Sequence, residues 1–352
     1  MMTLSAALES LEIKDGDLYQ GHIMQPFLFM LGFKAPRLRQ LTLHGAGDFF
    51  GSSKRFSCLT SLVVSKPVTF RQFWQIGALP QLKYFTVNLT GVSEASFVFP
   101  PSLPPPGFPQ LQSLTITGRL SIITCIIGPI SSNRLHELHI ITRTGKDPIL
   151  NRSAKDSSTG SPLWSPFLAK INQKWGQDIH ALSIEQEPSS SISDLPDFST
   201  YHFQLRCLSL RGWTVTDTQL GKLVTKFPDL MELRITGGCP FHKSLTLSGL
   251  STLAKQCPKL ALLQTSLDAS ILDPADDEVL SHGLRKLLLT TWQSVADKAV
   301  LARHLDRLFP RVVVEPNPDV ADKETWRTVN RFVSMFQDIR RDERIRRGLK
   351  SW

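Results

Sequence analysis

A hexapeptide with the pattern apolar-x-x-apolar-x-apolar returns along most of the chain, and it constrains the fold more than any other feature. It occurs about twelve times in 352 residues, and most copies begin about 21 to 30 residues apart, with one gap near 44. Because side chains alternate along a strand, the fourth and sixth positions should point into a core, and the third, fifth and seventh to the open side. The copies begin at Leu8, Leu38, Leu59, Leu82, Leu111, Leu135, Ile179, Leu205, Leu230, Leu260, Leu284 and Phe309.

This spacing predicts an α/β fold, a leucine-rich-repeat solenoid of about twelve units over residues 1–315. One copy cannot bury its own leucines, so we expect the copies to stack as a curved parallel sheet on the concave side, with helices and turns outside. The best-formed copy, Leu205–Leu230, predicts a helix that begins with a capping box at Thr216 and Gln219 and ends at Pro228.

Three segments interrupt the repeat and are expected to be loops, at residues 100–109, 143–162 and 188–200. The first holds six prolines in ten residues, which indicates an extended chain. We favour a stiff loop between repeats there, and the alternative is a ligand for an SH3-type domain. The other two are rich in Ser, Pro and Gly and are expected to be mobile, either as tolerated insertions or as sites of phosphorylation.

Residues 319–352 predict an amphipathic helix with a basic tail. Such a helix would close the end of the solenoid, because the last repeat otherwise exposes its leucines. The basic end could indicate nucleic-acid, nuclear-import or membrane binding, but interleaved Asp and Glu favour a solvated helix with internal ion pairs. The predicted buried stripe consists of Trp326, Val329, Val333, Phe336 and Ile339.

Three segments resemble one known family. The phrases TVTDTQLGKLVTKFPDLMEL and STLAKQCPKLALL resemble the repeat of F-box proteins, and WRTVNRFVSMFQDIRRDE is similar to the C-terminal end of fungal F-box/leucine-rich-repeat-like proteins. The resemblance implies that the repeats recognise a target protein. In the family, an N-terminal F-box module docks on the adaptor of a cullin-type ubiquitin ligase. No F-box segment is visible before Leu8, so we expect adaptor docking only if that module is supplied.

Composition narrows the class of partner and the compartment. The net charge of +9 favours a partner with an acidic surface, and we expect a protein rather than a nucleic acid. The most apolar stretches, Met24–Phe33 and Ile122–Ile130, are too short to cross a bilayer. Five cysteines form no CxxC pair, and the start does not read as a secretion signal, so we expect a cytoplasmic or nuclear protein.

No sequence motif indicates catalysis, a cofactor or a metal. His136 and His139 form HExH on a predicted strand, and their spacing turns the rings to opposite faces. The motifs GxxxxGK[ST], GxGxxG and GxSxG do not occur. We therefore expect a protein-binding module that is not an enzyme.

Binding residues are expected on the concave face, at outward positions of the hexapeptides. Tyr and Arg are favoured there because both are enriched among interface anchors. The alternative to a target-recognition protein of F-box type is a repeat scaffold without a ubiquitin-ligase link. We also expect self-association through the first copy, whose Leu8, Leu11 and Ile13 lack a neighbour on one side. The candidate contact residues are Tyr84, His139, Arg211, Glu232, Arg234 and Lys286.

Overall fold

The computed structural model divides the chain into two compact units. Unit 1 comprises Met1–Glu187 with Tyr201–Phe203, and unit 2 comprises Pro188–Thr200 with Gln204–Trp352. In the described ranges, no helix is long and apolar enough to span a membrane. The structure describes residues 5–14, 21–44, 55–92, 107–143, 164–187, 195–237, 245–270, 280, 282–290, 295, 297–316 and 323–348.

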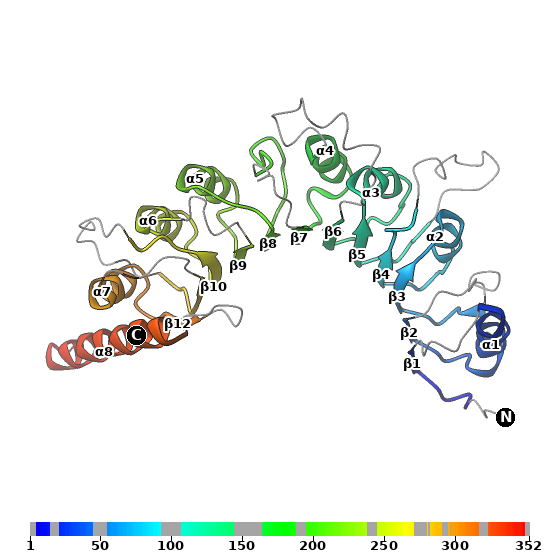
Figure 1. Cartoon of the computed structure of the whole chain (residues 1–352), viewed down its shortest axis with the longest axis horizontal. Helices are drawn as coiled ribbons and strands as arrows, with labels where there is room; N and C mark the ends of the chain where they lie inside the picture. Colours follow the sequence, from blue (N-terminus) through cyan, green and yellow to red (C-terminus); the bar gives the residue numbers. More distant parts are fainter. Residues whose placement is uncertain are drawn as a thin grey trace. The chain divides into compact units, whose positions relative to one another are not determined.

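Unit 1 is built from parallel strands that follow one another in chain order, β1 to β7. Helices α1 to α4 lie on one side of these strands and leave the other side open (Figure 1). The elements are β1 Ser10–Ile13, α1 Gly21–Lys34, β2 Gln40–Leu43, β3 Ser61–Pro67, α2 Phe70–Ile76, β4 Tyr84–Asn88, β5 Ser113–Gly118, α3 Leu120–Ile127, β6 Glu137–Thr142, α4 Trp164–Trp175 and β7 Ala181–Gln186.

Unit 2 repeats this α/β arrangement with strands β8 to β12, again parallel and in chain order. Helices α5, α6 and α7 lie on one side, and the long α8 packs on α7 and β12. The elements are β8 Cys207–Arg211, α5 Asp217–Lys226, β9 Glu232–Thr236, α6 Leu247–Gln256, β10 Leu262–Ser266, β11 Lys286–Thr290, α7 Lys298–Leu308, β12 Val313–Pro316 and α8 Lys323–Arg346.

Strand pairing follows the register of the hexapeptide. In unit 1, Ser61, Tyr84 and Ser113, each at the third position of its copy, pair across β3, β4 and β5. In unit 2, Cys207 of β8 pairs with Glu232 of β9 in the same way. A copy such as β5 hides its fourth and sixth residues completely, as predicted, whereas the inward residues Leu11 and Ile13 of β1 are only half-buried. The expectation of stacked parallel strands is therefore confirmed within each unit.

The last copy departs from this register. Lys286 pairs with Val313. If the copies that begin at Leu284 and Phe309 were paired position by position, Lys286 would instead lie opposite Arg311, the third residue of the last copy. The shift is two residues, so it preserves which side chains point inward, because strand side chains alternate with period two. Val314 is buried and Val313 is exposed.

The predicted capping box at the start of α5 is present. The Thr216 hydroxyl accepts from the Gln219 backbone N–H (3.3 Å), and the Gln219 side chain accepts from the Thr216 N–H (3.0 Å). Helix α2 has the same arrangement at Thr69 and Gln72. These bonds satisfy N–H groups that the first turn leaves unpaired, and so they fix where each helix begins.

Two of the predicted loops end in packed residues. Phe108, after the proline-rich segment, is fully buried and stacks against Phe85, with ring centroids 5.6 Å apart. Its φ of 42° lies in the left-handed region, a strain of about 1 kcal/mol that burial of the ring offsets. Phe198 is buried beside Phe227, so residues 195–200 pack on unit 2 although we expected a mobile segment. The remainders, 100–106, 144–162 and 188–194, lie outside the described residues.

Helix α8 covers the outer edge of β12. Asn330 accepts a hydrogen bond from the Val314 backbone N–H (2.9 Å), and Gln337 donates to the Val312 carbonyl (2.9 Å). The predicted stripe is confirmed at Trp326, Val329 and Val333, which are buried, but it is wrong at Ile339, which is exposed. The buried face continues through Arg340 instead, because adjacent helix residues point about 100° apart.

Arg340 makes the main polar contact between α8 and α7. Its guanidinium donates to the carboxylate of Asp306, which is buried. Burial, and next the charge of Arg344, lower the pKa of Arg340. Removing one partner of a buried ion pair lowers the free energy of unfolding, because the other partner is left as a buried charge without a counterion.

We predict that Asp306→Leu or Arg340→Met alone lowers the free energy of unfolding by about 3 kcal/mol. The double variant should lose much less, because both charges are then gone. Arg341→Met removes a solvent-exposed ion pair with Asp338 and should cost less than about 1 kcal/mol. Urea unfolding measures all four. Equal losses of unfolding free energy in the single and double variants would contradict this role of the Arg340–Asp306 pair between α8 and α7.

His282 ties two turns of unit 2 together in its neutral form. Its Nε2 lies 2.7 Å from the Cys257 carbonyl, and its Nδ1 accepts from the Leu284 N–H at 3.0 Å. The ring is buried edge-on against Phe309. Burial lowers the pKa of His282, although the bond to the Cys257 carbonyl opposes the shift. Protonation would place a hydrogen on Nδ1 and break the bond from Leu284.

The stability that neutral His282 provides should be complete above about pH 6.5 and be lost as the pH falls through the lower pKa of the folded protein. His282→Asn is the matched control, because Asn88 already makes the same bond to a backbone N–H two residues on (3.0 Å) and an amide does not titrate. Urea unfolding between pH 7.5 and 5 should show a larger loss for the wild type. Identical pH dependence would refute the role of His282.

Candidate functional site

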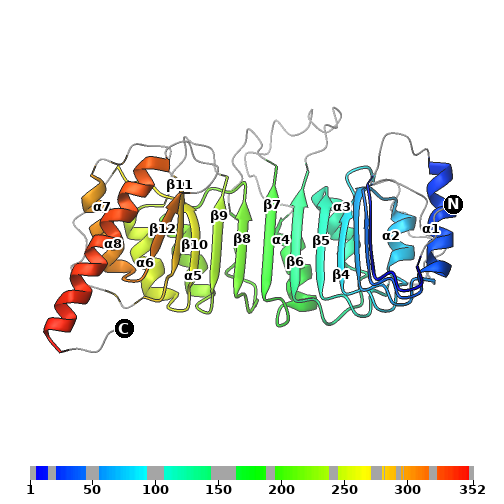
Figure 2. The same cartoon turned by 90° about the horizontal axis from the view of Figure 1, so that it is seen from below.

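The open strand face of unit 1 is rich in hydroxyl groups. On β3, β4 and β5 the outward residues carry no charge, and most are Ser or Thr. Figure 2 views the strands from this open side and shows β4 and β5 next to each other. The side chains of Ser61, Tyr84 and Ser113 form one row and those of Val63, Thr86 and Thr115 a second, whereas the register of β3 shifts after Val64, so that Asn88 pairs with Pro67. Such a face offers donors and acceptors to a partner without the cost of desolvating a charge. The residues are Ser61, Val63, Ser65, Tyr84, Thr86, Asn88, Ser113, Thr115 and Thr117.

Tyr84 is the one aromatic side chain among these nine outward residues. Its side chain is 49% exposed, and its hydroxyl has no hydrogen-bond partner among the described residues. Its neighbours in the same row, Ser61 and Ser113, are small, so the ring rises above them. Of the two candidates in unit 1, Tyr84 has the geometry of an interface anchor, with an apolar ring and a free polar tip.

His139 lies two strands away, on β6, and is half-buried. It pairs with Thr115 on β5 and with Ser183 on β7. Burial lowers its pKa, while the negative charge of Glu185 acts in the opposite direction. His139 is therefore neutral at pH 7 and contributes a hydrogen-bonding ring, not a cation, to this face.

The open face of unit 2 is charged, and its charges are partly paired. Glu232 and Arg234, on β9, form an ion pair of 3.2 Å. Lys286 on β11 pairs with Glu315 on β12 at 2.7 Å. Arg211 on β8 is exposed and a diagonal neighbour of Arg234. The structure thus brings the four candidates of unit 2 onto one face, where Glu232 and Arg234 pair with each other and Lys286 pairs with Glu315, so they do not form one cationic cluster.

The sequence analysis missed three apolar residues on this face of unit 2. Leu262 and Leu288 occupy outward positions on β10 and β11, and Val313 pairs with Lys286. Leu262 and Leu288 are half-buried, and Val313 is exposed. The sequence could have indicated two of them. Leu262 is the third residue of the copy at Leu260 and Leu288 the fifth residue of the copy at Leu284, and both are outward positions where most copies have a polar residue. These side chains add apolar contact area between the ion pairs.

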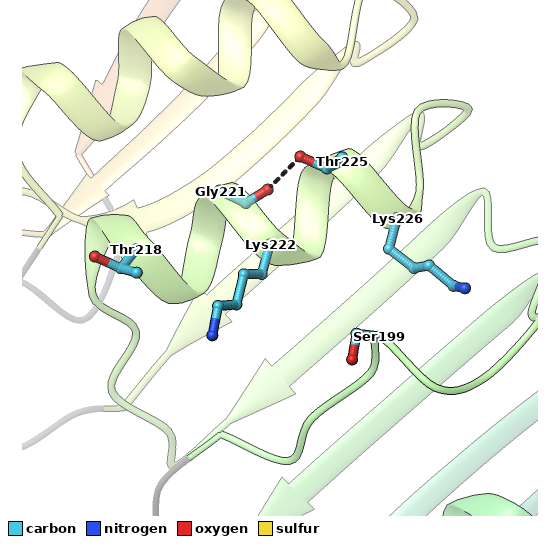
Figure 3. A pocket seen from close by; sticks show the side chains of 6 residues that line it. All are labelled: Ser199, Thr218, Gly221, Lys222, Thr225 and Lys226. Carbon is cyan, nitrogen blue, oxygen red and sulfur yellow. Dashed lines mark hydrogen bonds between the residues drawn. The ribbon is translucent and has the colours of Figure 1, made fainter.

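A pocket of about 500 Å³ lies on the helix side of unit 2, between α5 and the loop that carries Ser199. Lys222 and Lys226 extend from the helix toward that loop (Figure 3). The Thr225 hydroxyl donates to the Gly221 carbonyl (2.8 Å), and Ser199 belongs to a turn closed by Asp197. The described lining holds hydroxyl and lysine side chains and no histidine or cysteine.

Metal-ligating side chains do not cluster among the described residues, and one of the described cysteines is buried. No group of three or more His, Cys, Asp or Glu that could hold a metal ion occurs among them. Cys257 is buried, with its thiol 3.5 Å from the Phe227 carbonyl. Burial, and next the charge of Asp229, raise the pKa of this thiol to about 11, so it stays protonated and serves packing.

Comparison with known proteins adds no family. No protein-family model matches the sequence, and no curated protein is significantly similar to it. The strand faces are therefore the structural feature that points to a function.

Proposed function

We propose that this chain is a non-catalytic, leucine-rich-repeat protein-binding module whose target contacts the open strand face. The observation that carries the proposal is the register. It sets outward side chains of successive copies in rows, opposite to the helices that cover the other side within each unit. A row of strands about 4.8 Å apart presents an extended, ordered surface, which suits a protein better than a small molecule.

Within this proposal the two units contribute different chemistry. Unit 1 supplies hydroxyl groups around the anchor Tyr84. Unit 2 supplies Arg211 and two ion pairs with apolar residues between them. Ion pairs that are already formed fix the register of a partner more than they add affinity, because each must be partly desolvated on binding.

The kind of target recognition follows from the resemblance to fungal F-box/leucine-rich-repeat-like proteins. The resembling phrases form α5 with β9, α6 with β10, and the cap α8. We infer that the module selects substrates for a cullin-type ubiquitin ligase, with an F-box supplied for adaptor docking. The alternative is a scaffold that holds a protein without a ubiquitin-ligase link.

The test is affinity capture of the tagged chain from its native cells, with and without an F-box module joined to its N-terminus, followed by mass spectrometry. We expect the same set of target proteins in both samples, and the ligase adaptor only with the F-box. Stable partners without an adaptor in either sample would leave the scaffold alternative in place.

Variants of the strand face decide whether that face binds the targets. Tyr84→Ala and the charge reversal Arg234→Glu should each reduce target recovery at least about tenfold, the loss expected of an anchor worth 1.4 kcal/mol or more. The controls are Arg71→Glu on α2 and Arg303→Glu on α7, which are exposed on the helix side. Equal recovery with face and control variants, all shown to be folded by circular dichroism, would exclude the strand face as the binding surface.

A further inference from the structure

Helix α1 exposes an apolar cluster on the side away from the core. Leu28 and Leu31 are buried beneath the helix, whereas Phe29, Met30 and Phe33 are 42%, 46% and 56% exposed. The exposed area amounts to roughly 290 Å² when each side chain spans about 200 Å². This is well below the 800 Å² or so that each partner contributes to a standard interface. The cluster therefore fits a short segment and not a folded domain.

Arg55 is held across this cluster. Its guanidinium lies 3.8 Å from the ring centroids of both Phe29 and Phe33, whose own centroids are 5.3 Å apart. Gly32 allows the approach, because a Cβ at Gly32 would lie 2.9 Å from the Arg55 Cβ. Arg55 has no hydrogen-bond or ion-pair partner among the described residues, and its Nη1 is buried without one. The side chain is thus held by stacking on two rings, and no described carboxylate pairs with its charge.

Basic residues follow this cluster along the chain. Lys34 and Arg37 come shortly after Phe33 and are exposed. Between Gly21 and His136 the described residues contain nine Lys and Arg and no Asp or Glu, although Glu9 and Glu12, beside and on strand β1, are exposed. Cationic side chains beside an apolar centre are complementary to a partner with carboxylates around apolar side chains.

We propose that Phe29, Met30, Phe33 and Arg55, here called the α1 patch, bind an acidic segment of another protein that carries large apolar side chains. The apolar side chains of the segment would contact Phe29, Met30 and Phe33, which lie at the spacing by which helix faces are recognised. A carboxylate of the segment would pair with Arg55, which presents a planar fork suited to bidentate contact. The α1 patch is on the helix side of unit 1, so this contact is separate from the strand face.

Two other polyanionic partners fit less well. A nucleic acid would stack its bases on free ring faces, but Arg55 already lies against both phenylalanine rings. An anionic membrane would need a broad apolar helix face sunk into the headgroup layer, but Leu28 and Leu31 are committed to the protein interior. A peptide needs only the three exposed side chains and the guanidinium.

The experiment measures fluorescence anisotropy of a labelled synthetic peptide, in which Asp and Glu alternate with Leu and Phe, on titration with the full chain. The peptide should bind, and more weakly as salt rises. A matched peptide with Asn and Gln in place of Asp and Glu should bind at least about tenfold more weakly. Two other negatively charged ligands serve as the competing partners: a single-stranded DNA of 20 nucleotides and phosphatidylserine vesicles.

Paired variants locate the site. Met30→Ser and Arg55→Gln should each weaken peptide binding several-fold, while Met231→Ser, at an equally exposed methionine (46%) in unit 2, and Arg71→Gln on α2 should not. Tyr84→Ala should leave peptide affinity unchanged, which separates this result from the strand-face proposal. No peptide binding, binding insensitive to the patch variants, or equal or tighter binding of DNA or vesicles would each overturn the inference.

Discussion

The structure depends on one constraint, that no single copy of the hexapeptide can bury its own inward side chains. Each strand hides its fourth and sixth residues only when a strand in the same register lies on either side, as Ile116 and Ile140 do on β5 and β6. Stability in such an array is a sum of neighbour contacts, so its ends are its weak points. Unit 2 solves this at β12, where α8 supplies hydrogen bonds to the edge strand and Arg340 pairs with Asp306. In unit 1, Leu11 of β1 is only half-buried.

Because the inward positions of the strands are committed to packing, their outward positions are the ones free to vary. The two units have used that freedom differently. In unit 1, the outward residues of β3 to β5 are uncharged, mostly Ser and Thr, with Tyr84 projecting above them, whereas unit 2 has Glu232, Arg234 and Lys286 in ion pairs. A partner in contact with both chemistries would be selected by shape and hydrogen bonding as well as by charge.

The helix side has a structural role in most places, and polar groups there serve the backbone. Lys174 of α4 donates to the Gly128 carbonyl (2.5 Å) and Lys170 to the Thr124 carbonyl (3.0 Å), which satisfies the C-terminal end of α3. Burial, and next the charge of Lys170, lower the pKa of Lys174. The α1 patch differs from these sites, because Arg55 is held between two rings and serves no carbonyl among the described residues.

The sequence by itself determined the number and place of the strands, the inward and outward sense of their side chains, and the start of α5 at Thr216, because these depend on spacing within a few residues. It also named Tyr84 as an outward residue. Only the tertiary structure decided the two-residue shift at β12, the pairing of Lys286 with Glu315, the burial of Arg340 in place of Ile339, and the position of Arg55 between Phe29 and Phe33. Each of these contacts joins residues far apart in the chain, where the local period carries no information about which side chains meet.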